Sequence, residues 1–356
     1  MDLEPYGWTP VLAEAFAKYA PPGCLPARIV VQKGDLEAVS PAGLLHCHAA
    51  GRLKFAAEGA SDLPVVGDWV AIEARPAEQT GLIVGILPRC SSFVRKVPGA
   101  RTVAQIIAAN IDTAFLVSGL DHEFNPARIE RYLVLARESG ARQVVVLNKA
   151  DLCPDLESAL AMAAAAAPGV PLLVTSVPRH EGIGEFRAFL RTGITGALLG
   201  SSGVGKSSLI NELLGEERMK TRGVRESDSG GRHTTTHREL VLIPSGGMLI
   251  DTPGLRELQL WGEGSGLQES FEDVEEIALR CRFTNCLHDT EPGCAIREAV
   301  EGGHLGLDRL ENYRKLQREM SHLRSKYDAR EKIVNKQKVK KLTSGQKRGY
   351  KRRDRF

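Results

Sequence analysis

Short hydrophobic runs between glycines and prolines dominate residues 36–100. They occur within the stretches "GLLHCHAAGRLKF", "VVGDWVAIEA" and "GLIVGILPR". Short apolar runs with turn residues at this spacing are typical of the strands of a small barrel. The preceding residues 1–35 are interpreted as a short N-terminal extension, partly helical over "LAEAFAKYA" and interrupted by "PPG".

A second pattern begins near residue 101 and continues to about residue 268. Residues 125–140, "NPARIERYLVLARESG", have helical periodicity, with Pro126 near the start and Gly140 at the end. Strands that alternate with helices predict a parallel α/β sheet, whose ligands bind at the carboxyl ends of the strands. The expected buried strands lie within 110–120, 143–152, 170–177, 194–203 and 246–254.

Composition and charge narrow the class of protein. Of the 356 residues, 42% are hydrophobic, no apolar run is long enough to span a bilayer, and the acidic start does not resemble a secretion signal, so we expect a cytoplasmic protein. The net charge of +3 is unevenly distributed, because the tail 336–356 holds ten Lys or Arg and one acidic residue. A basic tail on an acidic body predicts a polyanionic partner, although a solvated tail without a partner is the alternative.

The stretch "GSSGVGKSSLINELL" matches a phosphate-binding loop that leads into a helix. Its glycines allow backbone N–H groups to surround phosphates, and the helix adds its positive N-terminal end. Lys206 is expected to reach the β and γ phosphates, and the Ser207 hydroxyl to bind Mg²⁺. The candidate nucleotide-binding residues here are Gly200, Ser201, Ser202, Gly203, Val204, Gly205, Lys206, Ser207 and Ser208.

Two further strand ends favour guanine over adenine. In "NKAD", residues Asn148, Lys149, Ala150 and Asp151, the Asp carboxylate can accept the two N–H groups that guanine presents and adenine lacks. Lys149 can lie across the base plane. The segment with Thr175 and Ser176 follows another strand and can offer a backbone N–H to the guanine oxygen. A P-loop kinase or ATPase is the alternative that "NKAD" argues against.

The remaining elements are "DTPG" at 251–254 and the segment "SDSGGRHTTTHREL" before it. Asp251 is expected to hold the Mg²⁺ shell through water and the Gly254 N–H to contact the γ-phosphate. Thr235, or a neighbouring Thr of 234–236, completes the Mg²⁺ shell when GTP orders the segment. The base-reading loops thus precede the phosphate loop, the reverse of the usual GTPase order, which indicates a circular permutation.

The water-orienting residue is not evident from the motifs. Leu255 occupies the position after the "DTPG" glycine, where many GTPases place a Gln. A leucine cannot orient water, so another group does so or the intrinsic rate is low. His233 is the nearest candidate in sequence, and a surface histidine without a role is an equal alternative.

After residue 268 the chain becomes polar and helical around a cysteine cluster. Cys281, Cys286, His288 and Cys294 have the spacing C-x4-C-x-H-x5-C, and three thiolates with one imidazole form a closed tetrahedral zinc set. Four protein ligands leave no open position, which predicts a structural role for the ion. Three free cysteines near a helix are the alternative.

Taken together, these motifs resemble the family of the bacterial ribosome small subunit-dependent GTPase A over nearly the whole chain. The resemblance implies an N-terminal OB-fold (36–100), a circularly permuted GTPase domain (101–268), a helical zinc-binding domain (269–335) and a basic tail (336–356). It also implies GTP hydrolysis stimulated by the 30S subunit, a role in late maturation of that subunit, and His233 as the catalytic residue.

RNA contacts are expected on the barrel. Arg52, Lys54, Arg89, Arg95 and Lys96 are candidates to contact phosphates of 16S rRNA, whereas Trp69 in "GDWV" is expected in the core. We expect a monomer without a membrane partner that meets other assembly factors. A nucleotide-gated switch with slow hydrolysis as a timer is the competing function.

Overall fold

A closed barrel forms the N-terminal part of the chain in the computed structural model, which describes residues 1–96, 104–122, 124–217, 238–251, 264–284, 286–323 and 325. Its five strands follow the order β1-β2-β3-β5-β4, and an additional pairing of β1 with β4 closes the sheet. The parallel pairing of β3 with β5 is the only parallel contact among these strands. The strands are β1 (Leu25–Lys33), β2 (Asp35–Ser40), β3 (Gly43–Ala49), β4 (Trp69–Arg75) and β5 (Thr80–Ile86).

The barrel begins earlier than the range 36–100 suggested by the sequence. Strand β1 lies within residues 1–35, and the helix α1 (Pro10–Tyr19) lies before the "PPG" interruption, where the sequence predicted a helix. Four consecutive central residues of β1 are buried, one of them Arg28, so the strand has no alternation of apolar and polar positions. Such a run carries no periodicity that would distinguish it from an apolar part of an extension.

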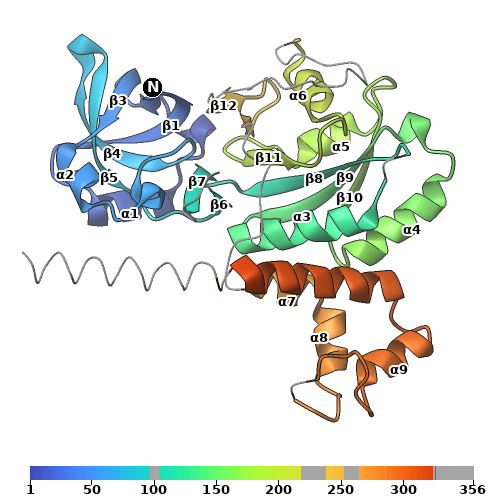
Figure 1. Cartoon of the computed structure of the whole chain (residues 1–356). Coiled ribbons are helices and arrows are strands. Elements are labelled where there is room, and N and C mark those ends of the chain that lie inside the picture. The colour runs from blue at the N-terminus through green and yellow to red at the C-terminus, as the bar shows by residue number, and fades with distance from the viewer. Residues whose placement is uncertain are drawn as a thin grey trace, which may run out of the picture.

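A six-stranded part of the same sheet forms the centre of the molecule (Figure 1). Its order is β10-β9-β8-β11-β13-β12, with all neighbours parallel except the antiparallel pair β12 and β13. The strands are β8 (Thr113–Gly119), β9 (Arg142–Asn148), β10 (Leu172–Thr175), β11 (Thr195–Leu199), β12 (Arg238–Leu242) and β13 (Met248–Asp251).

Helices cover both faces of this central sheet. Helices α3 (Pro126–Ser139) and α4 (Leu156–Ala166) lie on one face, and α5 (Ile183–Ala188) and α6 (Lys206–Leu214) on the other (Figure 1). The alternation of strand side chains explains the two cores. Leu116 and Val145 pack toward the first face, whereas Phe115 and Val144 pack toward the second. The result is a three-layer α/β/α arrangement of the kind that the strand-helix alternation predicted.

One buried arginine joins the barrel, the N-terminal residues and the central sheet. Strand β1 pairs with β12, and beside this contact the Arg28 guanidinium is 2% exposed. It donates to the Asn110 carbonyl oxygen at 3.0 Å, to Thr195 Oγ1 at 2.8 Å and to the Tyr6 carbonyl. Burial lowers its pKa to about 10, so the side chain stays charged at neutral pH. A buried cation with several acceptors holds these segments in one arrangement.

The C-terminal helices attach to the central domain through α3. The helix of residues 307–323 lies alongside α3 (Figure 1), and Arg131 of α3 makes two hydrogen bonds with Glu319, at 2.6 and 2.8 Å. Glu130, 5% exposed, accepts from Arg309 Nη1 at 2.8 Å and from Asn312. The other helices of this part are α7 (Ser265–Ser270), α8 (Glu272–Ala278) and α9 (Ala295–Glu301). Among the described residues, no helix has the length and apolarity to cross a membrane.

Candidate functional site

The phosphate loop connects the carboxyl end of β11 to the first turn of α6, as the sequence predicted. Gly200 has φ 157°, and a Cβ there would lie 2.4 Å from the Val117 carbonyl oxygen of the neighbouring strand. Gly205, with φ 96°, leaves space for the Asn148 amide, which a Cβ would approach to 2.2 Å. Both glycines are therefore required by the close packing of the loop against adjacent strands. Between them lie Ser201, Ser202, Gly203 and Val204, and Lys206, Ser207 and Ser208 open α6.

The Lys206 ammonium points back into the phosphate loop. Its side chain is 8% exposed, and Nζ donates to the carbonyl oxygen of Gly200 at 2.7 Å and to that of Ser201. This places a positive charge within the loop, next to the N-terminus of α6. Phosphate oxygens are ligands that a helix N-terminus with a neighbouring cation favours.

Asn148 links the base-reading loop to the phosphate loop. Its side chain is 2% exposed, and Nδ2 donates to the Val204 carbonyl oxygen at 2.9 Å. Its Oδ1 accepts from the Thr175 hydroxyl at 3.0 Å. The carboxyl ends of β9, β10 and β11 are thus joined by one buried amide. The base-reading loops and the phosphate loop that the sequence predicted therefore meet at one edge of the sheet.

The rest of "NKAD" is placed around this amide. Ala150 and Asp151 lie in a single turn of 3-10 helix, Ala150–Leu152. The Ser176 hydroxyl donates to Asp151 Oδ1 at 2.6 Å. Lys149 has a left-handed backbone, φ 65°, and its Nζ lies 2.6 Å from Asp121 Oδ2.

Asp251 ends strand β13, which lies next to β11, so its position in the sheet is adjacent to the phosphate loop. Three further residues expected at the site, His233, Thr235 and Gly254, lie outside the described residues. Leu255 and the basic tail 336–356 also lie outside them.

The permuted chain order is consistent with this geometry. Strands β8, β9, β10, β11 and β13 are mutually parallel, so the loops at their carboxyl ends share one edge of the sheet. Which loop comes first in the chain does not change where the loops meet. The segment after β13 leads to the C-terminal helices, which pack on α3 from the same domain.

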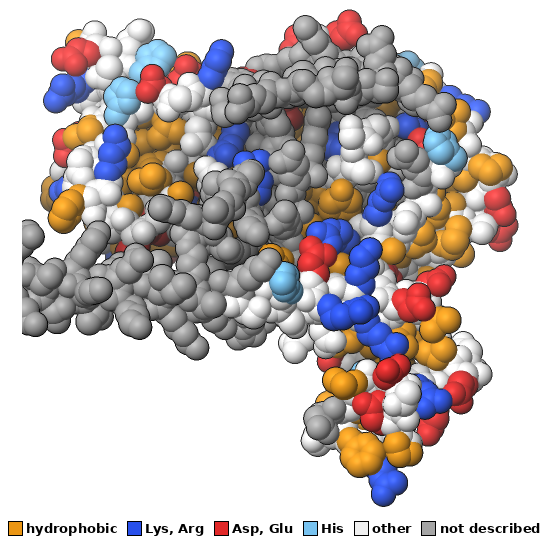
Figure 2. All heavy atoms as spheres, in the orientation of Figure 1, with side chains coloured by type: hydrophobic (Ala, Val, Ile, Leu, Met, Phe, Trp, Pro, Cys, Tyr) orange, Lys and Arg blue, Asp and Glu red, His pale blue; other side chains and the backbone are white. Residues whose placement is uncertain are grey.

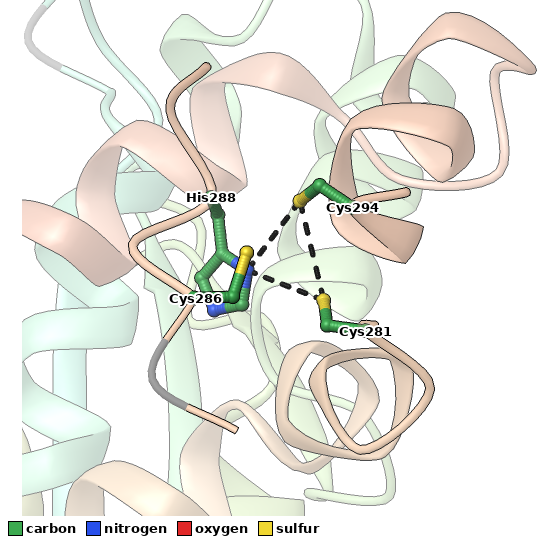
Figure 3. A group of neighbouring side chains, drawn as sticks. All are labelled: Cys281, Cys286, His288 and Cys294. Atoms are coloured by element: carbon green, nitrogen blue, oxygen red, sulfur yellow. Dashed lines mark hydrogen bonds between the residues drawn. The ribbon is translucent and has the colours of Figure 1, made fainter. Parts of the chain in front are cut away.

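The four predicted metal ligands converge in the C-terminal part (Figure 3). Their ligand atoms all lie within 4.8 Å of one another. The His288 Nδ1 atom is 3.5 Å from Cys281 Sγ and 3.6 Å from Cys294 Sγ, and those two sulfurs are 4.0 Å apart. A tetrahedral zinc ion places neighbouring nitrogen and sulfur ligands about 3.5–3.8 Å apart. Cys281, Cys286, His288 and Cys294 can therefore hold a metal ion.

Two charged residues next to the cluster, Arg314 and Glu291, influence the ligands and their loop. Burial and the Arg314 guanidinium lower the pKa of His288, which keeps the imidazole neutral and able to ligate. Glu291 accepts backbone N–H groups of Leu287 and Asp289, each at 2.9 Å, and of Thr290. These backbone bonds lower its pKa to about 2. Glu291 is thus an anion that shapes the ligand loop without being a ligand.

Among the five residues expected to contact phosphates on the barrel, the described side chains differ in how exposed they are. Arg52 and Lys54 are exposed on α2 (Gly51–Ala56), next to Phe55, whose side chain is 93% exposed. The expectation that Arg89 contacts RNA phosphates is corrected, because this side chain pairs with the buried Asp68 at 2.7 Å and donates to two backbone carbonyls.

The other barrel candidates are less accessible than α2. Arg95 is partly buried on β6 (Ser92–Lys96), which pairs with β7 (Ala104–Ala109), and the Lys96 side chain is outside the described residues. Trp69 is 3% exposed and lies in the core as predicted, and Phe93 is 1% exposed. The "HCH" stretch is an alternating strand, with Cys47 buried between two exposed histidines.

Comparison with known proteins agrees with this site. The family model described as RsgA GTPase matches residues 86–261, and the model described as 50S ribosome-binding GTPase matches residues 195–336. The protein named small ribosomal subunit biogenesis GTPase RsgA of Opitutus terrae is 43% identical over 98% of this chain and 97% of its own length. Its counterpart in Streptomyces coelicolor is 45% identical over 92% of this chain and 89% of its own.

Two solved structures share the fold. The crystal structure of YjeQ from Thermotoga maritima covers 82% of this chain and 97% of its own, with a TM-score of 0.62 and 28% identity. The structure of YloQ, described as a circularly permuted GTPase, has a TM-score of 0.59, 24% identity and coverage of 84% and 96%. The likeness to YloQ concerns the fold alone.

A closed barrel, a phosphate loop preceded by its base-reading loops and a C-terminal metal-ligand cluster define a circularly permuted P-loop GTPase. The enzyme is a GTP hydrolase. The chain belongs to the RsgA GTPase family.

Sequence reasoning missed two residues of the site. Asp121 pairs with Lys149 but has no motif around it, and only its position just after a predicted strand could have drawn attention to it. Glu291 belongs to no motif either, and its backbone contacts depend on the fold of the loop.

Proposed function

We propose that this protein binds the small (30S) ribosomal subunit through 16S rRNA and acts in late maturation of that subunit. In this role it hydrolyses GTP to GDP and phosphate, and the subunit stimulates the reaction. The observation that carries the proposal is the identity of 43–45% to proteins named small ribosomal subunit biogenesis GTPase RsgA along nearly the whole chain.

The nucleotide site is assigned from the loops at the sheet edge. We assign guanine recognition to Asp151 and Lys149, support of their loop to Asn148, and phosphate binding to the loop 200–205 with Lys206. Ser207 and Thr235 are the proposed Mg²⁺ ligands, and Asp251 and Gly254 complete the γ-phosphate side. The ammonium of Lys206 and the joined strand ends support this assignment.

The ion at the cysteine cluster is proposed to be zinc, one per chain, with a structural role. Thiolate sulfur favours zinc over calcium or magnesium, and the nitrogen–sulfur separations fit a tetrahedral ion. When bound, the ion would cross-link the ligand loops to the start of α9, because Cys294 is the residue before that helix. It would leave no coordination position for a substrate.

Two exposed surfaces are proposed to contact the ribosomal subunit. On the barrel, Arg52, Lys54 and Phe55 combine two cations with an exposed aromatic ring, which suits phosphate contact and base stacking. On the lobe below α3, Figure 2 shows exposed hydrophobic side chains, and Leu279 and Phe283 of this lobe are 87% and 41% exposed. The basic tail 336–356 adds sequence-independent attraction to RNA.

Hydrolysis is proposed to depend on His233. Leu255 cannot orient water, so the free enzyme is expected to turn over GTP slowly. The 30S subunit would bring His233 to the attacking water. Replacing this residue would then destabilise the transition state and lower the rate, while GTP binding would be little changed. A switch that uses slow hydrolysis only as a timer is the alternative function.

GTP turnover with and without purified 30S subunits tests the proposal. We expect stimulation by 30S subunits and little by 50S subunits, which matters because one matching family model carries a 50S description. His233→Ala should lose most of the stimulated rate while GTP affinity stays nearly unchanged, and Lys206→Ala serves as the inactive control.

Equal stimulation by both subunits, or none by either, would contradict the proposed partner. If His233→Ala is stimulated as strongly as wild type at saturating 30S, the catalytic histidine is wrong and another group positions the water. Deleting residues 336–356 should instead weaken 30S association and reduce its salt dependence.

A further inference from the structure

The turn after strand β8 contacts the base-reading loop at several points. Strand β8 is parallel to β9, and Gly119 stands opposite Asn148 in the register. The Leu120 N–H donates to the Asn148 carbonyl oxygen at 2.7 Å, and the Phe124 N–H closes the turn on the Asp121 carbonyl oxygen at 2.9 Å. Asp121 is therefore held by backbone bonds next to the start of "NKAD".

The Asp121 carboxylate faces Lys149 from this turn. Its Oδ2 atom lies 2.6 Å from Lys149 Nζ, and both side chains are largely buried, with 16% and 19% of their surfaces exposed. The carboxylate folds back over Gly119, where a Cβ would come within 3.3 Å of Oδ1. Glycine at that position thus leaves the space in which the carboxylate lies.

An ion pair at this place constrains the whole Lys149 side chain. The backbone of Lys149 is left-handed, and the carboxylate fixes the opposite end of the side chain at Nζ. With both ends held, the four methylenes between them lose most of their rotamer freedom before any nucleotide binds. A side chain ordered in advance loses less entropy when a ligand packs on it.

We propose that Asp121 is a positioning residue for the guanine base, which pins the Lys149 ammonium so that the lysine stem forms a ready surface for the base plane. This inference rests on the base site assigned above to Lys149 and Asp151. Asp121 itself acts through Lys149. Removing the carboxylate should therefore weaken binding of every purine nucleotide that packs on Lys149, without changing which groups on the base are recognised by Asp151.

A double-mutant cycle on the full chain tests this, with GDP affinity measured by calorimetry in the presence of Mg²⁺. Asp121→Ala should weaken GDP binding roughly tenfold, a mid-range value for two contacting residues. In a Lys149→Ala background the same change should alter affinity by less than about twofold. Asp121→Asn keeps the shape without the charge and should give an intermediate loss.

Comparing the affinities for two nucleotides with different bases distinguishes a positioning role of Asp121 from general damage to the base-reading loop. The GDP-to-IDP affinity ratio should stay at the wild-type value in Asp121→Ala, because the 2-amino group that IDP lacks is recognised by Asp151. Asp155→Ala is the matched control, since this carboxylate caps α4 four residues after Asp151 and accepts from Ser158 N at 3.0 Å. That variant should lower the melting temperature while leaving GDP affinity unchanged.

Three outcomes would overturn the inference. The first is wild-type GDP affinity in Asp121→Ala. The second is an equal loss from Asp121→Ala in the wild-type and Lys149→Ala backgrounds, which would mean that the carboxylate acts independently of the lysine. The third is wild-type affinity in Lys149→Ala alone, which identifies a failure of the assigned base site and removes the basis of this inference with it.

Discussion

The side-chain amide of Asn148 donates to the carbonyl oxygen of Val204 at 2.9 Å, across 56 positions of the chain. The same amide accepts from the Thr175 hydroxyl, so one buried side chain joins three strand ends. In this permuted order the base-reading residue comes first and the phosphate loop later. The contact between Asn148 and Val204 is where the two halves of the nucleotide site are connected.

Replacing Asn148 should therefore affect stability and nucleotide binding together. Asn148→Ala leaves the buried Val204 carbonyl and Thr175 hydroxyl without this partner, and we expect a loss of about 1–3 kcal/mol in the free energy of unfolding. Urea unfolding of the nucleotide-free protein measures this, and GDP titration measures the weakened binding. Thr175→Val removes one of the two bonds and should cost less. An unfolding free energy of Asn148→Ala equal to that of wild type would contradict the bridging role.

Base specificity should follow the chemistry of residue 151. Asp151→Asn is expected to weaken GTP and to favour xanthosine triphosphate, because an amide can donate to the xanthine oxygen where the carboxylate accepted from guanine. Competition between the two nucleotides measures the change. Ser176→Ala is the control, since it removes only the 2.6 Å hydroxyl contact to Asp151 and should keep the preference for GTP. Unchanged GTP affinity in Asp151→Asn would refute the assignment of Asp151.

Metal content should be about one zinc per chain in protein prepared without chelators, as expected for four ligands. Cys286→Ser should lower that content and destabilise the C-terminal part, because metal binding and folding are coupled. Elemental analysis and hydrogen exchange of α8 and α9 provide the readouts. The exposed Cys90 lies outside the cluster, so Cys90→Ser should retain the metal. A preparation that lacks zinc in the wild-type chain would overturn the assignment.

Acid should weaken the docking of helix 307–323 on α3. The hydrogen bonds from Arg131 lower the pKa of Glu319 below its ordinary value. The unfolded state then binds a proton more readily, so this stabilisation is present above the unfolded pKa, about 4.3, and is lost as pH falls through the lower folded value. Hydrogen exchange of this helix, compared between wild type and Glu319→Gln, isolates the effect from other acid-sensitive groups.

In Glu319→Gln, the part of the acid-induced loss of protection that comes from Glu319 should be absent. Glu311 lies exposed on the same helix, and Glu311→Gln should keep the wild-type pH profile. Identical profiles for wild type and Glu319→Gln between pH 3 and 6 would show that the pair with Arg131 does not link α3 to this helix.

The sequence alone determined those parts of the protein whose chemistry lies within a short stretch of chain. The phosphate loop, "NKAD" and the cysteine cluster each place their groups within 14 residues or fewer. Strand-helix alternation likewise determined the α/β class, because periodicity is a local property. The motif order indicated the permutation before any contact was known.

Only the tertiary structure decided which distant residues became partners. Arg89, expected at an RNA phosphate, pairs instead with the buried Asp68 just before β4, and Lys149 meets Asp121 from the turn after β8. Strand β1 joined both the barrel and the central sheet, with Arg28 buried at the junction. Such pairings depend on strand order and on the free energy of burying a charge, and neither is encoded in the spacing of neighbouring residues.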